Sequence, residues 1–326
     1  MMKYILSFFL LLSILSCKTA TKSEPIIITS TELKKTVSYL ASDELQGRHA
    51  GSEGIEKAAS YIESQLKSFG VKPYYETYRD HFKIDSLDAF NLVGFIEGTD
   101  DKLKDEVIIL GAHYDHIGYG KDAKRKSRKG NITETDSIAN GANDNASGTS
   151  AVIAMAKYFG TRKNNKRSIM FILFSAEELG LLGSKHLAKR LKSENINLYT
   201  MVNFEMIGVP LKDRDYQAFV SGYDLSNMAD KINEYTGSNL IGFSEIAKKY
   251  NLFRQSDNYP FYETFKLPCQ TIASCDLSNY DYYHHSDDEI SELDYEFMAN
   301  LINKTIPAIE KMSNTSTKEI VMHESE

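Results

Sequence analysis

Short apolar runs alternate along this chain with longer segments whose apolar residues recur at helical spacing. The runs at 106–112, 168–174 and 199–204 are short enough to be buried strands, whereas 151–161 and 181–192 have helical periodicity. Strands that alternate with helices predict a sheet covered on both faces. We therefore expect an α/β protein: a single domain with a twisted, mostly parallel mixed sheet and helices on both faces.

The remaining elements continue this alternation. We expect further strands at 91–97, 216–221 and 271–274, and further helices at 31–40, 55–69, 228–235 and 293–312. Gly70 is expected to end the second helix. Ser291 and Asp294 are expected to form a capping box before the last helix. The tail at 313–326 is expected to be frayed.

Residues 1–17 have the pattern of a lipoprotein signal peptide. Lys3 gives a positive start, residues 4–14 are apolar, and Leu15-Ser16-Cys17 ends the segment, which is too short to span a bilayer. The ending resembles a bacterial lipobox, in which Cys17 carries the lipid; an ordinary secretory signal is the alternative. We expect an exported lipoprotein of the periplasm or outer membrane, anchored through Cys17, with a tether at 18–24 and one domain at 25–326.

The charge argues against nucleic-acid binding, and the cysteine spacing argues against a disulfide. A net charge of −7 and a pI near 5.7 argue against a nucleic-acid-binding surface. The basic run at 121–130 is expected to be a solvated loop, or to flank the site and attract an acidic group. Cys269 and Cys275 bracket a predicted strand of roughly 20 Å, too long for a disulfide, so we expect free thiols.

Acidic and histidine side chains gather where the predicted strands end. His113, Glu177, Glu178 and Glu205 follow three of these strands closely, and ligands bind beyond the carboxyl ends of strands in open α/β sheets. Asp144 lies at a loop-to-helix junction among glycine and alanine residues, where it could cap the helix or reach a ligand.

Imidazole and carboxylate donors in this number favour zinc over magnesium or calcium. Two ions with about three protein ligands each need only five residues if one carboxylate bridges them. Asp144 fits the bridge, with His113 and Glu205 completing one position and Glu178 and His284 the other.

Two neighbouring acidic residues are assigned supporting roles. Asp115 is placed to accept the free imidazole N–H of His113 and to fix its tautomer; taken alone, it would be a solvated strand end. Adjacent side chains point in different directions, so Glu178 can bind a metal while Glu177 acts as a base towards water. An exposed helical pair is the alternative for these two glutamates.

The motifs that contain these residues resemble those of the co-catalytic di-zinc aminopeptidases, the family of the secreted bacterial leucyl aminopeptidases, within the superfamily of the glutaminyl cyclases. The similarity spans most of residues 38–290. In chain order the motifs are Leu40–Arg48, His113–Asp115, Gly141–Gly148, Ala176–Ser184, Asn203–Gly208, Ser256-Asp257 with Pro260-Phe261, and Tyr283–Asp288.

The resemblance implies a zinc exopeptidase fold for 25–326, two zinc ions per chain, and Glu177 as general base. It also implies a cis peptide between Asp144 and Asn145, and a hydrogen bond from Tyr283 to the developing oxyanion. Two departures stand out: the family usually has aspartate in place of Asn143, and many members have aspartate in place of Glu205.

The predicted metal ligands and the family resemblance together indicate a function. We expect His116 and His285 to lie outside the ligand set, and we expect a metal-dependent aminopeptidase acting on peptides. A one-zinc acyltransferase resembling glutaminyl cyclases and a catalytically silent binding ectodomain are the alternatives. Loops between about 209 and 282 would form the substrate pocket, and the sequence leaves the side-chain preference and oligomeric state open.

Overall fold

The computed structural model describes residues 26–126 and 132–324. The predicted signal peptide with Cys17 and the tether at 18–24 lie outside these residues. None of the helices in the two described stretches has the length and apolar character that crossing a membrane requires.

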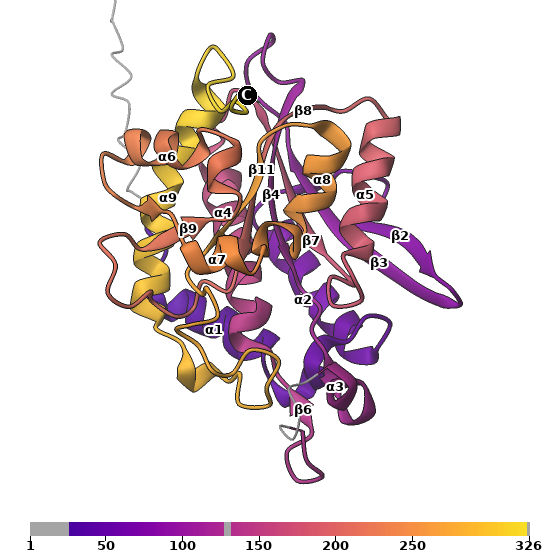
Figure 1. Ribbon diagram of the computed structural model, residues 1–326. Coiled ribbons are helices and arrows are strands. Elements are labelled where there is room, and N and C mark those ends of the chain that lie inside the picture. Colours follow the sequence, from indigo (N-terminus) through magenta and orange to yellow (C-terminus); the bar gives the residue numbers. More distant parts are fainter. Residues whose placement is uncertain (1–25, 127–131, 325–326) are drawn as a thin grey trace, which may run out of the picture.

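Nine strands of the described residues form one mixed sheet (Figure 1). The strands are β1 Lys72–Pro73, β2 Arg79–Ile84, β3 Leu87–Ile96, β4 Glu106–His113, β7 Ser168–Phe174, β8 Asn197–Glu205, β9 Ala218–Val220, β10 Ile241–Gly242 and β11 Cys269–Ala273. Their order is β1-β3-β7-β4-β8-β11-β9-β10, with β2 paired to β3. The central strands β7, β4, β8 and β11 are parallel, and β3 and β9 join them antiparallel.

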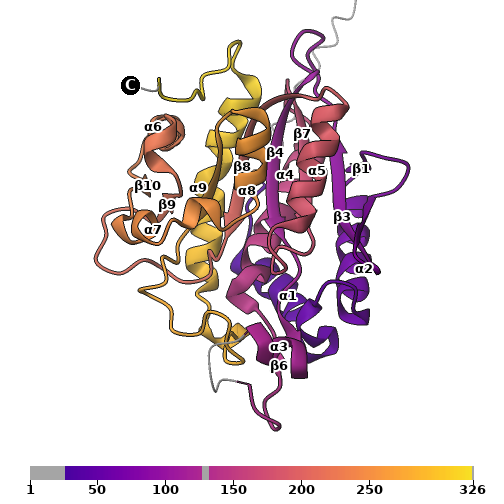
Figure 2. The same cartoon turned by 45° about the vertical axis from the view of Figure 1, so that its right-hand side comes forward.

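Helices cover both faces of this sheet (Figure 2). The helices of the described residues are α1 Ser30–Leu40, α2 Glu53–Ser68, α3 Gly120–Lys126, α4 Gly148–Arg162, α5 Leu182–Ser193, α6 Met228–Thr236, α7 Glu245–Lys249, α8 Asn258–Phe265 and α9 Tyr295–Asn314, and of these α3 lies away from the sheet. Ile108 and Leu110 of β4 belong to the core with α1, α2, α4 and α9, whereas Val107 and Ile109 belong to the core with α5 and α8. Successive side chains of a strand point to opposite faces, which explains the continuous apolar run.

The predicted elements are confirmed at the centre of the sheet and incomplete at its edges. Strand β7 coincides with the prediction, and β4 extends it by one residue. Strand β2 and helices α7 and α8 were not predicted. Cys269 and Cys275 are buried free thiols, as expected.

Two predictions near the C-terminus are wrong. Asp294 alone caps α9, accepting the backbone N–H of Phe297, because Ser291 lies in the short 3₁₀ turn Ile290–Glu292. The described part of the tail is held to the domain rather than frayed: Arg167 donates to the carbonyl of Thr315, and Ile320 N donates to the Tyr199 hydroxyl over 2.9 Å.

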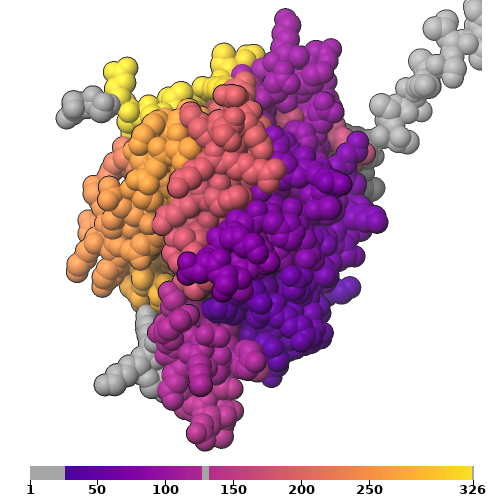
Figure 3. Space-filling view, turned by 90° about the vertical axis from the view of Figure 1, so that its right-hand side faces the viewer, coloured from indigo at the N-terminus to yellow at the C-terminus, as the bar shows by residue number. Residues whose placement is uncertain are grey.

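Residues 121–126 of the basic run are helical rather than a loop, and 127–130 lie outside the described residues. Helix α3 lies between two short paired strands, β5 Gly118–Tyr119 and β6 Ile138–Ala139. Its Ala123 is buried against Ile117, Ile132 and Ala139. This segment projects at the lower end of the molecule in Figures 1 and 3, beyond the carboxyl end of β4.

Candidate metal centre

His113 and Glu205 are the last residues of two neighbouring parallel strands, β4 and β8, so their side chains meet at one edge of the sheet. The Nε2 atom of His113 lies 2.9 Å from Oε1 of Glu205 and 3.3 Å from Oδ1 of Asp144. His113 and Asp144 are buried, and Glu205 keeps part of its surface exposed. The structure thus brings the first predicted ligand set together.

Asp144 lies in the irregular turn Ala142–Ser147 that precedes α4, and its peptide bond to Asn145 is cis, as the resemblance implied. The carboxylate of Asp288 accepts the backbone N–H groups of Asn143 and Asp144, at 2.7 and 3.0 Å. The side chain of Asn145 accepts the N–H of Gly148 at the helix start. The carboxylate of Asp144 therefore accepts no hydrogen bond from the start of α4 and turns towards the histidines.

Glu178 and His284 form the second predicted set with Asp144. Nε2 of His284 lies 3.1 Å from Oε2 of Glu178 and 3.4 Å from Oδ2 of Asp144. Glu178 is buried, whereas His284 is partly exposed. His284 lies in a loop and has a backbone φ of 54°. The two oxygens of Asp144 thus face different histidines.

Asp115 contacts His113, as the sequence predicted, and also the loop of the two glutamates. The Nδ1 atom of His113 lies 3.1 Å from the backbone oxygen of Asp115 and 3.6 Å from its carboxylate. The carboxylate accepts the backbone N–H groups of Glu177 and Glu178, at 3.2 and 3.3 Å. Asp115 therefore contacts the His113 ring through both its carbonyl and its carboxylate, and the carboxylate also holds the loop that carries the two glutamates.

The two histidines predicted to lie outside the ligand set, His116 and His285, have different surroundings. His285 lies apart from the ligand cluster, and its Nδ1 accepts the N–H of Asp287. His116 is fully buried, with Nδ1 2.9 Å from Oε1 of Glu178 and 3.7 Å from Oδ2 of Asp144. His116 thus lies inside the cluster that the sequence assigned without it.

Burial and charge act on these groups in opposite directions. Burial disfavours ionised carboxylates, but the nearby imidazoles outweigh it and lower the pKa of Glu178 to about 2. Burial lowers the pKa of His284, but its contacts with Asp144 and Glu178 raise it to about 10. Glu177 lies in desolvated surroundings that raise its pKa well above the usual value, and the charges of Glu178 and Glu205 reinforce this.

Several supporting residues were not assigned roles from the sequence. Asp288 holds the turn of Asp144, and Ser256 donates a hydrogen bond to Oε2 of Glu205. The guanidinium of Arg48 is buried and donates to the backbone carbonyls of Leu40, Tyr114, Asn140 and Gly141. Motif membership was the only sequence signal for these residues, because their partners are distant along the chain.

The cluster fits divalent metal ions. Two groups of donors are each compact enough to hold an ion: His113, Asp144 and Glu205, and His116, Asp144 and Glu178. Both ring nitrogens of His116 and Oε1 of Glu178 are buried without an aligned hydrogen-bond partner among the described residues. Buried polar atoms of this kind need an ion or water to offset the loss of solvation. Nitrogen and carboxylate donors are those that zinc prefers.

An apolar pocket of about 80 Å³ opens beside Glu205 and Tyr283. Met206, Phe219, Leu252, Ala273, Cys275 and Leu277 supply most of its apolar lining. The ring of Tyr283 stacks on His284 with 4.0 Å between centroids. Burial raises the pKa of Tyr283, as do the charges of the surrounding carboxylates, so its hydroxyl remains protonated and able to donate.

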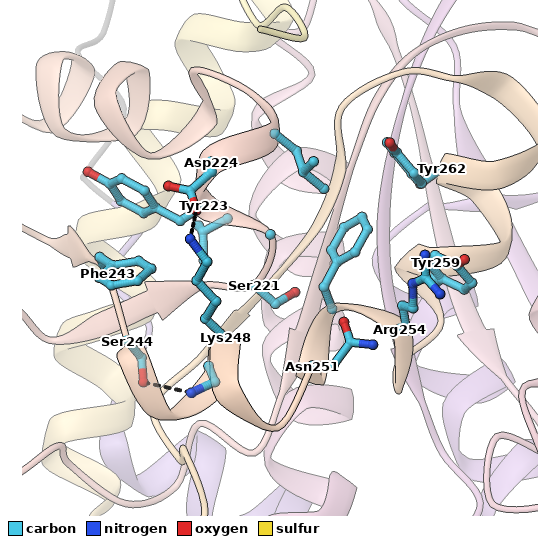
Figure 4. A pocket seen from close by; sticks show the side chains of 15 residues that line it. Ser221, Tyr223, Asp224, Phe243, Ser244, Lys248, Asn251, Arg254, Tyr259 and Tyr262 are labelled. Carbon is cyan, nitrogen blue, oxygen red and sulfur yellow. Dashed lines mark hydrogen bonds and ion pairs between the residues drawn. The ribbon is translucent and has the colours of Figure 1, made fainter. Parts of the chain in front are cut away.

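A larger cavity of about 280 Å³ shares Ser221 with this pocket (Figure 4). Tyr223, Phe243, Tyr259 and Tyr262 contribute aromatic rings to its lining, and Lys248 is paired with Asp224. None of the predicted site residues lines this cavity, so the smaller pocket is the one next to the proposed chemistry.

Comparison with known proteins agrees with these features. The sequence signature of Peptidase family M28 matches residues 91–308. A "Probable zinc metalloprotease" of Pyrenophora tritici-repentis is 34% identical over 117 residues, which are 36% of this chain and 24% of that protein. "Aminopeptidase YwaD" of Bacillus subtilis is 29% identical over 178 residues, 53% of this chain and 33% of that protein. The alignments thus span about a quarter to a third of these two relatives.

Solved structures share the fold. The LapA aminopeptidase of Legionella pneumophila has a TM-score of 0.67 and 24% identity, covering 89% of this chain and 71% of the other. The glutaminyl cyclase of Porphyromonas gingivalis has a TM-score of 0.67 and 14% identity, covering 88% and 100%. At these identities the similarity shows the fold alone, and both activities occur on it.

Proposed function

Because this chain belongs to peptidase family M28, we propose that it is a zinc-dependent aminopeptidase with two metal positions. The observation that carries the proposal is the orientation of Asp144. Its Oδ1 lies 3.3 Å from His113 and its Oδ2 lies 3.4 Å from His284, so one carboxylate faces two separate donor sets.

In this proposal His113 and Glu205 hold one ion and Glu178 and His284 hold the other, with Asp144 shared between them. Divalent ions at such positions supply the Lewis acidity that activates water and polarises a peptide carbonyl. Ser256 and Asp115 keep the donors in place through hydrogen bonds to the side chain of Glu205 and to the backbone of Glu178.

Glu177 is proposed as the general base. Its desolvated surroundings raise its pKa, which makes the carboxylate a stronger base towards the proton of a water molecule. It would accept a proton from the attacking water and pass it to the leaving amine. The protonated hydroxyl of Tyr283 would donate a hydrogen bond to the carbonyl oxygen as negative charge develops there.

The lining of the small pocket favours a free amino terminus over a free carboxyl terminus. No lysine or arginine is among its lining residues in the described parts of the chain, whereas Glu205 is. A positively charged amine is attracted by such surroundings, and a carboxylate is repelled. The apolar walls suit one apolar side chain of moderate size.

The glutaminyl-cyclase alternative has a specific observation in its favour, namely the shared fold. Metal analysis together with aminoacyl, N-blocked and dipeptide substrates distinguishes the alternatives. An aminopeptidase binds two zinc ions and cleaves only substrates with a free amine. A cyclase binds one ion and releases ammonia from N-terminal glutamine, and a binding ectodomain does neither.

We further propose that the protein is exported and anchored to a membrane by a lipid on Cys17. The support is the sequence alone: a positive start, an apolar segment, and a cysteine directly after Ser16. The domain from residue 25 would then act on peptides outside the cytoplasm.

A further inference from the structure

His116 has surroundings that the two predicted ligand sets do not explain. It lies three residues beyond the end of β4 and is fully buried. Its backbone N–H donates to the carbonyl of Arg48 over 3.3 Å. The ring lies edge-on to that of His284, with 5.8 Å between centroids. A buried imidazole thus stands beside a predicted ligand, with neither of its nitrogens hydrogen-bonded within the described residues.

The short distance between His116 and Glu178 does not correspond to an aligned hydrogen bond. Nδ1 of His116 and Oε1 of Glu178 lie 2.9 Å apart, but the angle between them does not suit a hydrogen bond, and neither atom has another hydrogen-bond partner among the described residues. Two ligand atoms bound about 2.0–2.1 Å from one tetrahedral zinc ion lie about 3.3 Å from each other. Nδ1 of His116 lies 2.9 Å from Oε1 of Glu178 and 3.7 Å from Oδ2 of Asp144, so these distances are close to those between ligands of one zinc ion.

The backbone around His116 leaves room for its ring. Gly141 has φ of 60°, and a Cβ atom at this position would lie 2.5 Å from Cγ of His116 and 2.3 Å from the carbonyl oxygen of Asp144. Any other residue would therefore displace the ring or the turn that carries Asp144. The same glycine that gives the turn its conformation keeps the imidazole against the two carboxylates.

We infer that His116 is a fourth protein ligand at the second metal position, together with Asp144, Glu178 and His284. The inference rests on the proposed two-metal function and goes beyond its ligand set. The second position then has four protein donors, whereas the first has three: His113, Asp144 and Glu205. Four donors close a zinc site and three leave a coordination place open. The second position should therefore bind zinc more tightly and fill first, and the first should keep the place for water or substrate.

The test isolates the second position. In protein carrying Glu205→Gln the first position loses the one carboxylate donor that it does not share, so the tight zinc binding that remains, measured by chelator competition, belongs to the second position. In this background His116→Asn keeps an amide able to donate towards Glu178 but removes the ring nitrogen. His285→Asn is the matched control, because His285 is the adjacent histidine outside the cluster.

We expect His116→Asn to weaken zinc binding by at least about a hundredfold and to change the visible spectrum of bound Co²⁺. His285→Asn should leave affinity within about threefold. An unchanged affinity and spectrum in His116→Asn would overturn the inference, because a hydrogen-bond donor would then suffice.

A second measurement needs no substitution at His116. The paramagnetic NMR spectrum of the Co²⁺-loaded Glu205→Gln protein should contain shifted ring N–H signals from two histidines, whereas one histidine would contradict the assignment. The unsubstituted protein tests the parent proposal separately, since binding of fewer than two zinc ions would overturn the two-metal function itself.

Discussion

One carboxylate oxygen of Asp288 accepts the backbone N–H of Asp144 over 3.0 Å, and this contact fixes the turn from which Asp144 faces both donor sets. The other oxygen accepts the N–H of Asn143 and the hydroxyl of Tyr280. All three contacts need an acceptor, so the amide in Asp288→Asn would place a donor against a donor. We expect zinc affinity to fall about 10- to 100-fold, as measured by chelator competition. Asp287→Asn, at the exposed neighbouring residue, should leave zinc affinity nearly unchanged. Equal losses of affinity in the two variants would show that the loop responds to its charge and not to these hydrogen bonds.

The adjacent glutamates should separate proton transfer from metal binding. Glu177→Gln keeps the size of the side chain but removes the proton acceptor, so we expect two bound zinc ions and a kcat lowered by roughly a hundredfold or more. Glu178→Gln replaces an anionic ligand by a neutral amide, so we expect one zinc ion to be lost, and activity with it. Elemental analysis and steady-state kinetics on the two variants check both statements.

The opposite pattern of metal loss would reverse the two assignments. Retention of both ions with unaltered turnover in both variants would show that this site is not the catalytic one.

Two residues of the small pocket should change side-chain preference in opposite directions. Ala273→Leu fills the pocket, so kcat/KM for substrates with N-terminal leucine or phenylalanine should fall by about tenfold or more relative to alanine. Leu252→Ala enlarges it and should favour phenylalanine over leucine. Zinc content should stay at the wild-type value in both. If all substrates changed in parallel, the pocket would not bind the N-terminal side chain.

Removal of metal should destabilise the protein, and increasingly so at alkaline pH. In the metal-free protein the pKa of His284 is about 10, against an ordinary value near 6.5, because the adjacent carboxylates outweigh burial. A raised pKa contributes stability that is complete below about pH 6.5 and is lost as pH rises towards about 10. The raised pKa of Glu177 also stabilises the folded protein at low pH. This contribution is lost as pH rises above the ordinary pKa of a glutamate.

Zinc binding has the opposite pH dependence, because imidazole must lose its proton to bind the ion. We expect the metal-free protein to melt at lower temperature at pH 9 than at pH 6. The increase in melting temperature caused by zinc should be larger at pH 8 than at pH 6. Thermal unfolding with zinc and with chelator across this range is the measurement, and a metal-free protein that grew more stable towards pH 9 would contradict the charge assignment.

Lipid anchoring predicts a change of location. In Cys17→Ala the acceptor of the lipid is absent, so the protein should move from the membrane fraction to the soluble fraction after cell lysis. Cys269→Ala is a suitable control, because Cys269 is a buried free thiol of the folded domain. Unchanged membrane association of Cys17→Ala would rule out this anchor.

The sequence predicted what depends on local pattern and missed what depends on distant contacts. Strand β7 was predicted correctly because every residue in it is buried, which gives a continuous apolar run. Strand β2 was missed because it lies at the edge, pairs only with β3 and exposes His81 and Lys83, so its sequence contains no continuous apolar run. His113 and Glu205 could be predicted together because both end neighbouring parallel strands.

His116 could not be predicted in the same way. Its place in the cluster depends on Gly141, 25 positions later in the chain, and no spacing rule relates a histidine to a glycine across a loop. The tail at 313–326 was expected to fray because it contains no regular pattern; 313–324 are the residues of it that the structure describes. Their order comes instead from Arg167 and Tyr199, side chains that the rest of the fold supplies.

Arg48 lies before the segment that matches the family signature, yet the metal centre depends on it. The family signature begins at residue 91, yet the buried guanidinium that joins the carbonyls of Tyr114, Asn140 and Gly141 comes from residue 48. A protein truncated to start at residue 91 would leave those three carbonyls without their shared donor and would expose the surface of α4 that α1 and α2 cover. The smallest unit able to assemble the metal centre is therefore longer than the segment that matches the family signature.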